Sequence, residues 1–278
     1  MNWAIIGLGF ISSRHINAIK ETGGKLLMAC DIDGEKRHKL EPDVMFFNDY
    51  KSMAKSPFFQ DIDYLAICTP NYLHHSMLTD PLLVNKKILC EKPLTIDDNF
   101  EGLGDVKTVL QLRYNPKVEQ IKKSLKKKDN YIKIIVGTYR EPEYWNSWKG
   151  NPKLSGGMMM NMGIHYLDLL IHLLGKPLEG DKRQYLYTVD EGSMGAASIS
   201  FEKGEGFIYI EFFKKPCEVI RTIEVNGEKM DLEGATIPLK EGTTTNLHTE
   251  VYKAFIKGDG IPVEEARKSL DLLKRLKV

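Results

Sequence analysis

Short apolar runs recur along the first third of the chain, at residues 3–7, 26–30, 64–68 and 87–90. Loops and helical patterns separate them, and repeated strand, loop and helix units are typical of a parallel, doubly wound sheet. Residues 109–116 continue the series, and we predict there the last strand of a first domain that spans residues 1–114.

Alternating apolar and polar positions dominate the rest of the chain. They predict strands at residues 131–139, 185–189, 196–201, 207–213 and 219–225, joined by turns at Lys203-Gly204 and Asn226-Gly227. Helical spacing predicts helices over residues 118–128, 166–174 and 249–257 and from Pro262 onward. The predicted fold class is therefore α/β: a doubly wound parallel sheet, followed over residues 115–278 by an α+β domain with a mostly antiparallel open sheet.

Composition limits the function. Hydrophobic residues make up 42% of the 278 residues, enough for packed cores, and the formal charge of +1 gives no support to a nucleic-acid binder. No basic leader precedes the first apolar run, and no run approaches the ~18 residues that a membrane span requires. We expect a soluble, cytoplasmic protein. The four cysteines lack metal-site spacing and are interpreted as buried free thiols, so no metal is predicted.

A glycine turn follows the first apolar run. Residues 7–12, with the sequence GLGFIS, lead from the predicted strand into a helical pattern, which is the context of a dinucleotide-binding fingerprint. Gly7 permits the tight turn, Gly9 lets a pyrophosphate approach the backbone, and the helix N-terminus supplies amide donors. Ser12 occupies the third glycine position, where its small side chain still permits close packing of helix on strand.

Asp31 ends the second apolar run. It follows Gly9 by about 22 residues, near the spacing of the acid that hydrogen-bonds the adenosine ribose. Its charge would repel a 2′-phosphate, so NAD is favoured over NADP. Asp33 could share this role, and a surface turn acid is the alternative for either residue.

Polar groups also follow the next two predicted strands. Residues 69–75 (TPNYLHH) bring hydroxyl, amide and imidazole groups to the place where a nicotinamide ribose would lie; a helix cap with surface histidines is the alternative. Glu91-Lys92-Pro93 follows the fourth run. Ligands of open parallel sheets bind beyond the carboxyl ends of the strands, so we expect Lys92 to face a ligand from a stiff turn. The sequence leaves open whether the peptide bond before Pro93 is cis.

The second half carries one strong motif. Asn161, His165 and Asp168 are spaced four and then three apart, which places them on one helical face after a glycine pair. An imidazole flanked by an amide and a carboxylate can be held in one tautomer and accept a proton. A core histidine hydrogen-bonded by Asp168 is the alternative.

Together these motifs resemble the glucose-fructose oxidoreductase, inositol dehydrogenase and MocA-like (Gfo/Idh/MocA) family over most of the chain. The resemblance rests on the glycine turn with His15 after it, Asp31, residues 69–71 with His74, and residues 91–93. It implies a Rossmann domain that holds a nicotinamide cofactor, with Lys92 at the reacting hydroxyl. The expected cofactor ligands are Gly7, Gly9, Phe10, Ile11, Asp31, Thr69, Pro70, Asn71, His74, Glu91, Lys92 and Gln111.

Three features resemble one branch of that family. Asn161 stands where relatives carry aspartate, and residues 110–114 (LQLRY) and 147–150 (SWKG) look like the branch that oxidises UDP-N-acetylglucosaminuronic acid at the sugar 3-hydroxyl. That branch supplies keto-sugars for surface polysaccharide (lipopolysaccharide) synthesis. The substrate ligands expected on this basis are Lys92, Arg113, Trp148, Lys149, Asn161, His165 and Asp168. A structural ion pair is the alternative for Arg113, and loop packing is the alternative for the tryptophan.

We therefore predict an NAD-dependent sugar dehydrogenase in which His165 accepts the hydroxyl proton and Lys92 hydrogen-bonds the same oxygen. The resemblance implies a homodimer or homotetramer, and no nucleic-acid or membrane partner is expected. Two alternatives stay open. One is a keto-sugar reductase or free-polyol dehydrogenase of the same family. The other is a non-catalytic NAD-binding regulatory protein. Residues 95–107 keep this alternative open, because that stretch is shorter than the matching one in relatives.

Overall fold

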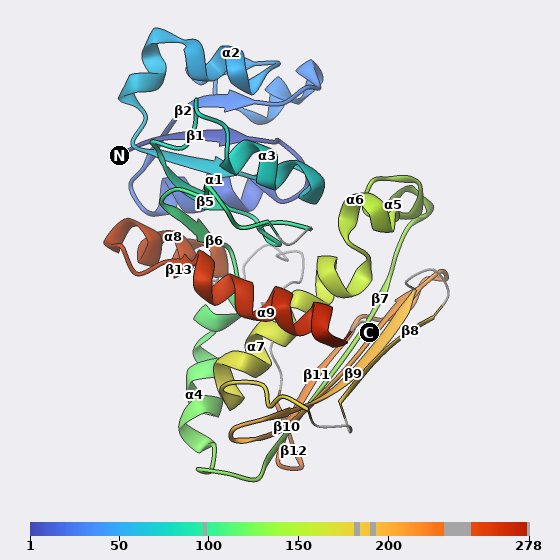
Figure 1. The fold of residues 1–278 in the computed structure, drawn as a ribbon. Coiled ribbons are helices and arrows are strands. Elements are labelled where there is room, and N and C mark those ends of the chain that lie inside the picture. Colours follow the sequence, from blue (N-terminus) through green and yellow to red (C-terminus); the bar gives the residue numbers. More distant parts are fainter. Residues whose placement is uncertain (97–98, 181–183, 190–192, 231–245, 277–278) are drawn as a thin grey trace. The chain divides into compact units, whose positions relative to one another are not determined.

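The computed structural model describes all residues except 97–98, 181–183, 190–192, 231–245 and 277–278. The chain divides into two compact units, residues 1–109 with 244–263, and residues 110–243 with 264–278 (Figure 1). The sequence predicts a single break near residue 114, whereas residues 244–263 belong with the first unit. No helix in the described part of the chain is long and apolar enough to cross a membrane.

The first unit is built on a seven-stranded sheet with the order β13-β6-β5-β4-β1-β2-β3. Its strands are β1 (Asn2–Ile6), β2 (Lys25–Cys30), β3 (Met45–Phe47), β4 (Tyr64–Ile67), β5 (Lys87–Cys90), β6 (Val106–Thr108) and β13 (Ile261–Pro262). The strands β1 to β6 are parallel, and β13 pairs antiparallel with β6. The predicted doubly wound sheet is confirmed. Its order reverses between β1 and β4, which is where such sheets bind ligands.

Helices and short turns connect these strands. They are α1 (Ser12–Glu21), α2 (Tyr50–Lys55), α3 (His74–Leu78) and α8 (Leu247–Lys257), with 3-10 turns η1 (Gly34–Lys39), η2 (Pro57–Asp61) and η3 (Asn71–Leu73). The fully buried Trp3 of β1 stacks on Tyr64 with ring centroids 4.8 Å apart, and it packs at a tilt against Tyr252 of α8 with centroids 4.7 Å apart. Burial of aromatic surface therefore explains why α8 packs with the first unit.

The second unit carries a six-stranded sheet with the order β12-β11-β7-β10-β9-β8. The strands are β7 (Asn130–Tyr139), β8 (Tyr185–Val189), β9 (Met194–Phe201), β10 (Gly204–Phe213), β11 (Ile220–Val225) and β12 (Glu228–Met230). Only the β7–β10 pair among these is parallel, so the mostly antiparallel sheet is confirmed. The helices are α4 (Pro116–Ser124), α5 (Pro142–Asn146), α6 (Pro152–Ser155), α7 (Ile164–Leu174) and α9 (Val263–Leu276), and α7 follows a π turn, η5 (Met159–Gly163).

One predicted strand near residue 114 is wrong, and the helix predicted after it is confirmed but ends earlier. Residues 111–114 form a 3-10 turn, η4 (Gln111–Tyr114), and not a strand. Both Gln111 and Leu112 are buried, and a continuously buried run has no alternation by which a strand could be distinguished from a turn. The helix predicted to reach residue 128 ends at Ser124, because the extended backbone of Leu125 stops it.

Candidate active site

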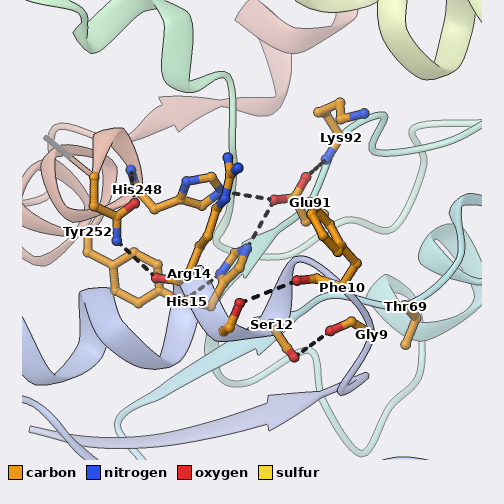
Figure 2. A network of polar contacts seen from close by, with 12 residues as sticks. Gly9, Phe10, Ser12, Arg14, His15, Thr69, Glu91, Lys92, His248 and Tyr252 are labelled. Carbon is orange, nitrogen blue, oxygen red and sulfur yellow. Dashed lines mark hydrogen bonds and ion pairs between the residues drawn. The ribbon is translucent and has the colours of Figure 1, made fainter. Parts of the chain in front are cut away.

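The first unit presents a dinucleotide cradle at the end of β1. Gly7 has a φ of +94°, and a Cβ atom there would lie 2.7 Å from the carbonyl oxygen of Cys68, so no other residue fits. A Cβ atom on Gly9 would meet open space. The buried Ser12 donates a hydrogen bond of 2.7 Å to the Gly9 carbonyl (Figure 2). The serine thus closes the turn where a third glycine is usual, and α1 begins there with its amide groups.

Asp31 fixes this turn from the end of β2. Its carboxylate accepts the backbone N–H groups of Leu8 at 2.7 Å and Asp33 at 3.0 Å, and Lys36 Nζ lies 3.2 Å away. Burial alone would raise the pKa of Asp31, but these hydrogen bonds outweigh it and the pKa lies below its ordinary value. An anionic acceptor is therefore held beside the glycine turn.

Two apolar side chains stand out at the same edge of the sheet. Phe10 in the glycine turn is 72% exposed, and Ile32, next to Asp31, is 91% exposed. Large apolar groups exposed beside fixed polar groups are typical of a ligand face. The open approach to Gly9, the Asp31 carboxylate and these two side chains fit a dinucleotide such as NAD, with Ile11 at the start of α1 beside them.

The turn after β4 is tied to the turn after β5. His74 is fully buried, and its two ring nitrogens lie 2.6 Å from the Pro93 carbonyl and 3.0 Å from the Thr69 carbonyl. Burial lowers the pKa of His74, although the two carbonyl oxygens favour its protonated form. The sequence predicts His74 as a direct cofactor ligand. Both nitrogens already contact protein, so His74 clamps the two turns, and its role as a cofactor ligand stays a prediction. Thr69 and Pro70 at the same edge are both half-buried.

Glu91 is a buried anchor behind Lys92 (Figure 2). One carboxylate oxygen lies 3.0 Å from His15 Nε2 and 3.5 Å from His248 Nε2, and the other accepts the backbone N–H of Lys92 at 3.2 Å. Burial opposes the charge, but the contacts with the two histidines hold the pKa of Glu91 well below its ordinary value. Glu91 therefore has a role inside the protein, and its predicted contact with the cofactor stays a prediction.

The same network reaches α8. The phenol oxygen of Tyr252 lies 2.8 Å from His15 Nδ1. The sequence analysis identifies neither Tyr252 nor His248, because nothing in the spacing shows that α8 belongs with the first unit. His15, Glu91 and His248 offer ligand atoms within 4.8 Å of one another, which could hold a metal ion, yet their contacts with one another already account for the arrangement. The peptide bond between Lys92 and Pro93 is cis.

In the second unit Arg113 and Asp168 form a buried ion pair. The guanidinium donates from Nε at 2.8 Å and from Nη2 at 2.6 Å to the two oxygens of Asp168, and from Nη1 to Glu265 at 3.3 Å. Ser269 also donates to Asp168, at 3.1 Å. Burial opposes the charge of Arg113, but the two carboxylates leave its pKa above the ordinary value.

This ion pair joins two predicted substrate ligands. It is the structural contact that the sequence left open as the alternative for Arg113, and Asp168 contacts Arg113 and Ser269. Their roles as substrate ligands stay predictions. His165 lies in the first turn of α7 and is buried. Asn161 lies in the π turn before it and donates to the Tyr144 hydroxyl at 3.3 Å. The roles of Asn161 and His165 at the substrate stay predictions.

The remaining predicted residues are divided between the units. Asn71 is buried at the start of η3 in the first unit. Gln111, a predicted cofactor ligand, falls in the second unit and is buried. Trp148 and Lys149 are half-buried in the loop after α5, with Lys149 Nζ 5.9 Å from the centre of the indole. Burial lowers the pKa of Lys149, and the nearby Arg140 lowers it further.

Comparison with known proteins identifies the family. One oxidoreductase family matches the chain twice, with its NAD-binding Rossmann fold over residues 1–113 and its C-terminal alpha/beta domain over residues 130–269. The chain belongs to the Gfo/Idh/MocA family. The predicted NAD-binding Rossmann domain is thereby confirmed.

Solved structures resemble the whole chain. The WlbA (WbpB) dehydrogenase from Thermus thermophilus, in complex with NAD and UDP-GlcNAcA, is 27% identical with a TM-score of 0.83, and the match covers 100% of this chain and 95% of that one. The WlbA dehydrogenase from Bordetella pertussis, in complex with NADH and UDP-GlcNAcA, shares the fold at 23% identity and a TM-score of 0.78, covering 99% of this chain and 95% of that one.

Curated relatives match over shorter lengths. The uncharacterized oxidoreductase YrbE of Bacillus subtilis is 29% identical over 62% of this chain and 53% of its own length. The myo-inositol 2-dehydrogenase of Thermotoga maritima is 22% identical over 64% of this chain and 56% of its own length. The chain thus spans just over half the length of these two relatives.

Proposed function

We propose that the protein is an NAD-dependent dehydrogenase that oxidises the 3-hydroxyl of a UDP-linked, N-acetylated hexuronic acid. The likeness to the Thermus WlbA dehydrogenase with NAD and UDP-GlcNAcA extends over the whole chain and supports this substrate. The sequence features around Asn161, Arg113 and Trp148 favour the same branch. A place in surface polysaccharide synthesis, a cytoplasmic location and a homodimer or homotetramer stay predictions from the sequence.

The observation that carries the proposal is the clamped turn of Lys92. It lies after β5, at the carboxyl edge of the sheet that also carries the glycine turn and Asp31. Glu91 holds its backbone N–H, and His74 holds the carbonyl of Pro93. A lysine on a turn fixed at both ends is pre-organised, which is what catalysis at a bound sugar hydroxyl requires.

Within this proposal each side chain has one task. Lys92 donates a hydrogen bond to the reacting hydroxyl oxygen and stabilises the negative charge that develops there. His165 accepts the hydroxyl proton. The cofactor, when bound, supplies a two-electron hydride acceptor. Asp31 and the glycine turn orient it, and Asn161, which does not titrate, serves as a hydrogen-bonding ligand for the substrate.

Removal of either proposed catalytic group tests the function. Lys92→Ala and His165→Ala are expected to lower kcat with UDP-N-acetylglucosaminuronate by at least about a hundredfold, since general acid–base groups contribute about that much or more. Turnover is followed by the absorbance of reduced nicotinamide. NAD affinity, measured by calorimetry, is expected to stay within about threefold of wild type for His165→Ala, since the nicotinamide cofactor is held by the first unit.

Lys117→Ala is the matched control for the lysine, because it removes the same charge from α4, at a position outside the predicted site residues. It is expected to leave kcat unchanged. Near-normal turnover by both Lys92→Ala and His165→Ala would sink the catalytic assignment. NAD binding by the wild type without turnover of any sugar would favour the regulatory alternative.

A second candidate is oxidation of a free polyol. The match to the myo-inositol 2-dehydrogenase of Thermotoga maritima favours it. A screen that compares UDP-linked uronates with free sugars and inositols separates the two functions. A response to neutral polyols alone would overturn the nucleotide-sugar substrate and leave the dehydrogenase assignment intact. Reduction of a keto-sugar is tested with the same protein supplied with NADH.

A further inference from the structure

Two inward-facing rows of the second sheet end in arginine. Alternate residues of a strand share one face of the sheet. The buried alternate positions of β7, which include Val136, lead to Arg140 just after the strand, and those of β11, which include Ile223, lead to Arg221. The antiparallel ladder pairs Arg221 with Val136, so the two rows share one face of the sheet. The apolar face of this sheet therefore becomes cationic at one end.

Aromatic rings fix the first of these arginines. The guanidinium carbon of Arg140 lies 4.8 Å from the ring centre of Tyr144 and 4.7 Å from that of Phe212. The two rings are themselves in edge contact, with centroids 5.5 Å apart. Stacking covers the faces of a guanidinium and leaves its N–H groups, which lie in the plane, for hydrogen bonds.

Several N–H groups of the two guanidiniums are buried without an acceptor in the described part of the chain, while Arg221 also has a side-chain hydrogen bond with Tyr166. The Nε atom of Arg140 and the Nε and Nη1 atoms of Arg221 are buried without a hydrogen bond. No carboxylate of the described residues forms an ion pair with either arginine. Buried polar groups without partners are rare in proteins, and buried cations are usually paired.

The cations also act on one another. Burial lowers the pKa of Arg140, and Arg221 lowers it further while Tyr144 opposes the shift. Burial lowers the pKa of Arg221 as well, opposed by Tyr166. Lys149, in the loop after α5, is a third half-buried cation within the electrostatic reach of Arg140. Three cations gathered in a partly dehydrated place repel one another and favour an anion among them.

Packing alone does not account for this arrangement. Stacking on two aromatic rings is sufficient to explain the position of the Arg140 side chain. Arg221 has no such ring contact with the described residues. An arginine at an inward position of a strand, with two buried donors left over, is costly unless a ligand completes it.

We propose that Arg140, Arg221 and Lys149 form a binding site for an oxyanion, a carboxylate or a phosphate, carried by the substrate. The identity of the ligand as an anionic sugar derivative rests on the proposed function, whereas the anion site itself rests on this cluster. A uronate carboxylate and a nucleotide diphosphate present the same chemistry to a guanidinium edge, namely planar or tetrahedral oxygens that accept two hydrogen bonds at once.

Calorimetric titration with two probes tests the site. Inorganic pyrophosphate represents the diphosphate and D-glucuronate represents the carboxylate, each added to the full-length protein at constant ionic strength. The wild type is expected to bind at least one of them. The double variant Arg140→Gln/Arg221→Gln is expected to bind that probe at least about tenfold more weakly, since two charge-assisted contacts are lost. Loss confined to glucuronate assigns the carboxylate, and loss confined to pyrophosphate assigns the diphosphate.

Arg267→Gln is the matched control, because it removes the same charge from an exposed side chain of α9 that pairs with Asp271. It is expected to bind both probes like the wild type. Equal binding by the double variant and the wild type overturns the site. If the double variant does not fold, Arg221→Lys keeps the charge but loses the planar fork and is expected to weaken binding by about three- to tenfold. Binding of neither probe by the wild type also overturns the site.

Steady-state kinetics separate this inference from the proposed function. The KM for UDP-N-acetylglucosaminuronate is expected to rise at least about tenfold in Arg221→Gln with kcat within about threefold, because the contact is made equally before and during the reaction. Turnover with an unchanged KM would sink the anion site and keep the function. Anion binding without turnover of this substrate would sink the function and keep the site.

Discussion

Glu91 is enclosed by two histidines and by the backbone of the residue that follows it. The buried carboxylate of Glu91 stays charged because His15, His248 and the backbone N–H of Lys92 all contact its oxygens. The reactive lysine is therefore positioned by its neighbour in sequence, and that neighbour is held by residues from α1 and from α8.

Glu91→Gln is expected to destabilise the first unit by about 2–3 kcal/mol near neutral pH, since hydrogen bonds to a buried charge are lost. The pKa of Glu91 in the folded protein is below its unfolded value. Its charge thus contributes stability that is present above the unfolded pKa and is lost as pH falls through the folded pKa. The difference between wild type and variant should therefore shrink in acid below about pH 4. Urea unfolding at several pH values measures this difference.

Glu41→Gln provides the comparison for this prediction. Glu41 pairs with Lys20 at 2.7 Å, but both side chains are more than half exposed. Exposed pairs contribute about 0–1 kcal/mol, so this variant should change stability little at any pH. Equal losses in the two variants would show that Glu91 is not an anchor.

At the scale of an element, the turn between β1 and α1 contains two glycines that are required for different reasons. Gly7 is required by the protein itself, because of its positive φ and the nearby Cys68 carbonyl. A Cβ atom on Gly9 would meet no other protein atom, so we expect the glycine to be required by a ligand that approaches the turn. The sequence motif alone does not separate these two roles, and the structure does.

Alanine substitutions distinguish the two glycines. Gly7→Ala is expected to cost at least about 2 kcal/mol of stability, since a left-handed residue gains a Cβ and the backbone must shift. Gly9→Ala is expected to change stability by less than about 1 kcal/mol but to weaken NAD binding at least about tenfold, because the methyl group occupies the path of the pyrophosphate. Thermal unfolding and NAD titration measure the two effects. Normal NAD affinity in Gly9→Ala would show that the cofactor does not approach there.

Elements with a clear period could be predicted from the sequence, and those decided by burial could not. The alternation in β7 and β10 and the strand, turn and helix of residues 2–21 are confirmed. The turn at residues 111–114 was not predictable, because residues 109–112 are continuously buried and show no alternation. The ion-pair partners of Arg113 also could not be predicted, since Asp168 lies 55 residues and Glu265 lies 152 residues away in the sequence. Arg221 carried a usable signal, a charge at an inward strand position.

At the scale of the whole molecule, cofactor binding and the Arg113–Asp168 pair belong to different units. The glycine turn and Asp31 lie in the first unit, whereas Arg113, Asp168 and α9 belong to the second unit. The side chain of Arg113 is 11% exposed and that of Asp168 is 1% exposed, so the pair is shielded from solvent. We infer that it stabilises the second unit, in which α9 is joined to α7 and η4.

A double-mutant cycle tests this division. Arg113→Met and Asp168→Leu are each expected to cost roughly 3–5 kcal/mol, because each leaves a buried charge without its partner. The double variant should be more stable than either single variant, since no buried charge is then unpaired. Arg267→Met, which breaks the exposed pair with Asp271, should cost less than about 1 kcal/mol. NAD affinity should be unchanged throughout. A stable Arg113→Met variant with a raised KM for the sugar would return the guanidinium to the substrate-binding role that the sequence predicts.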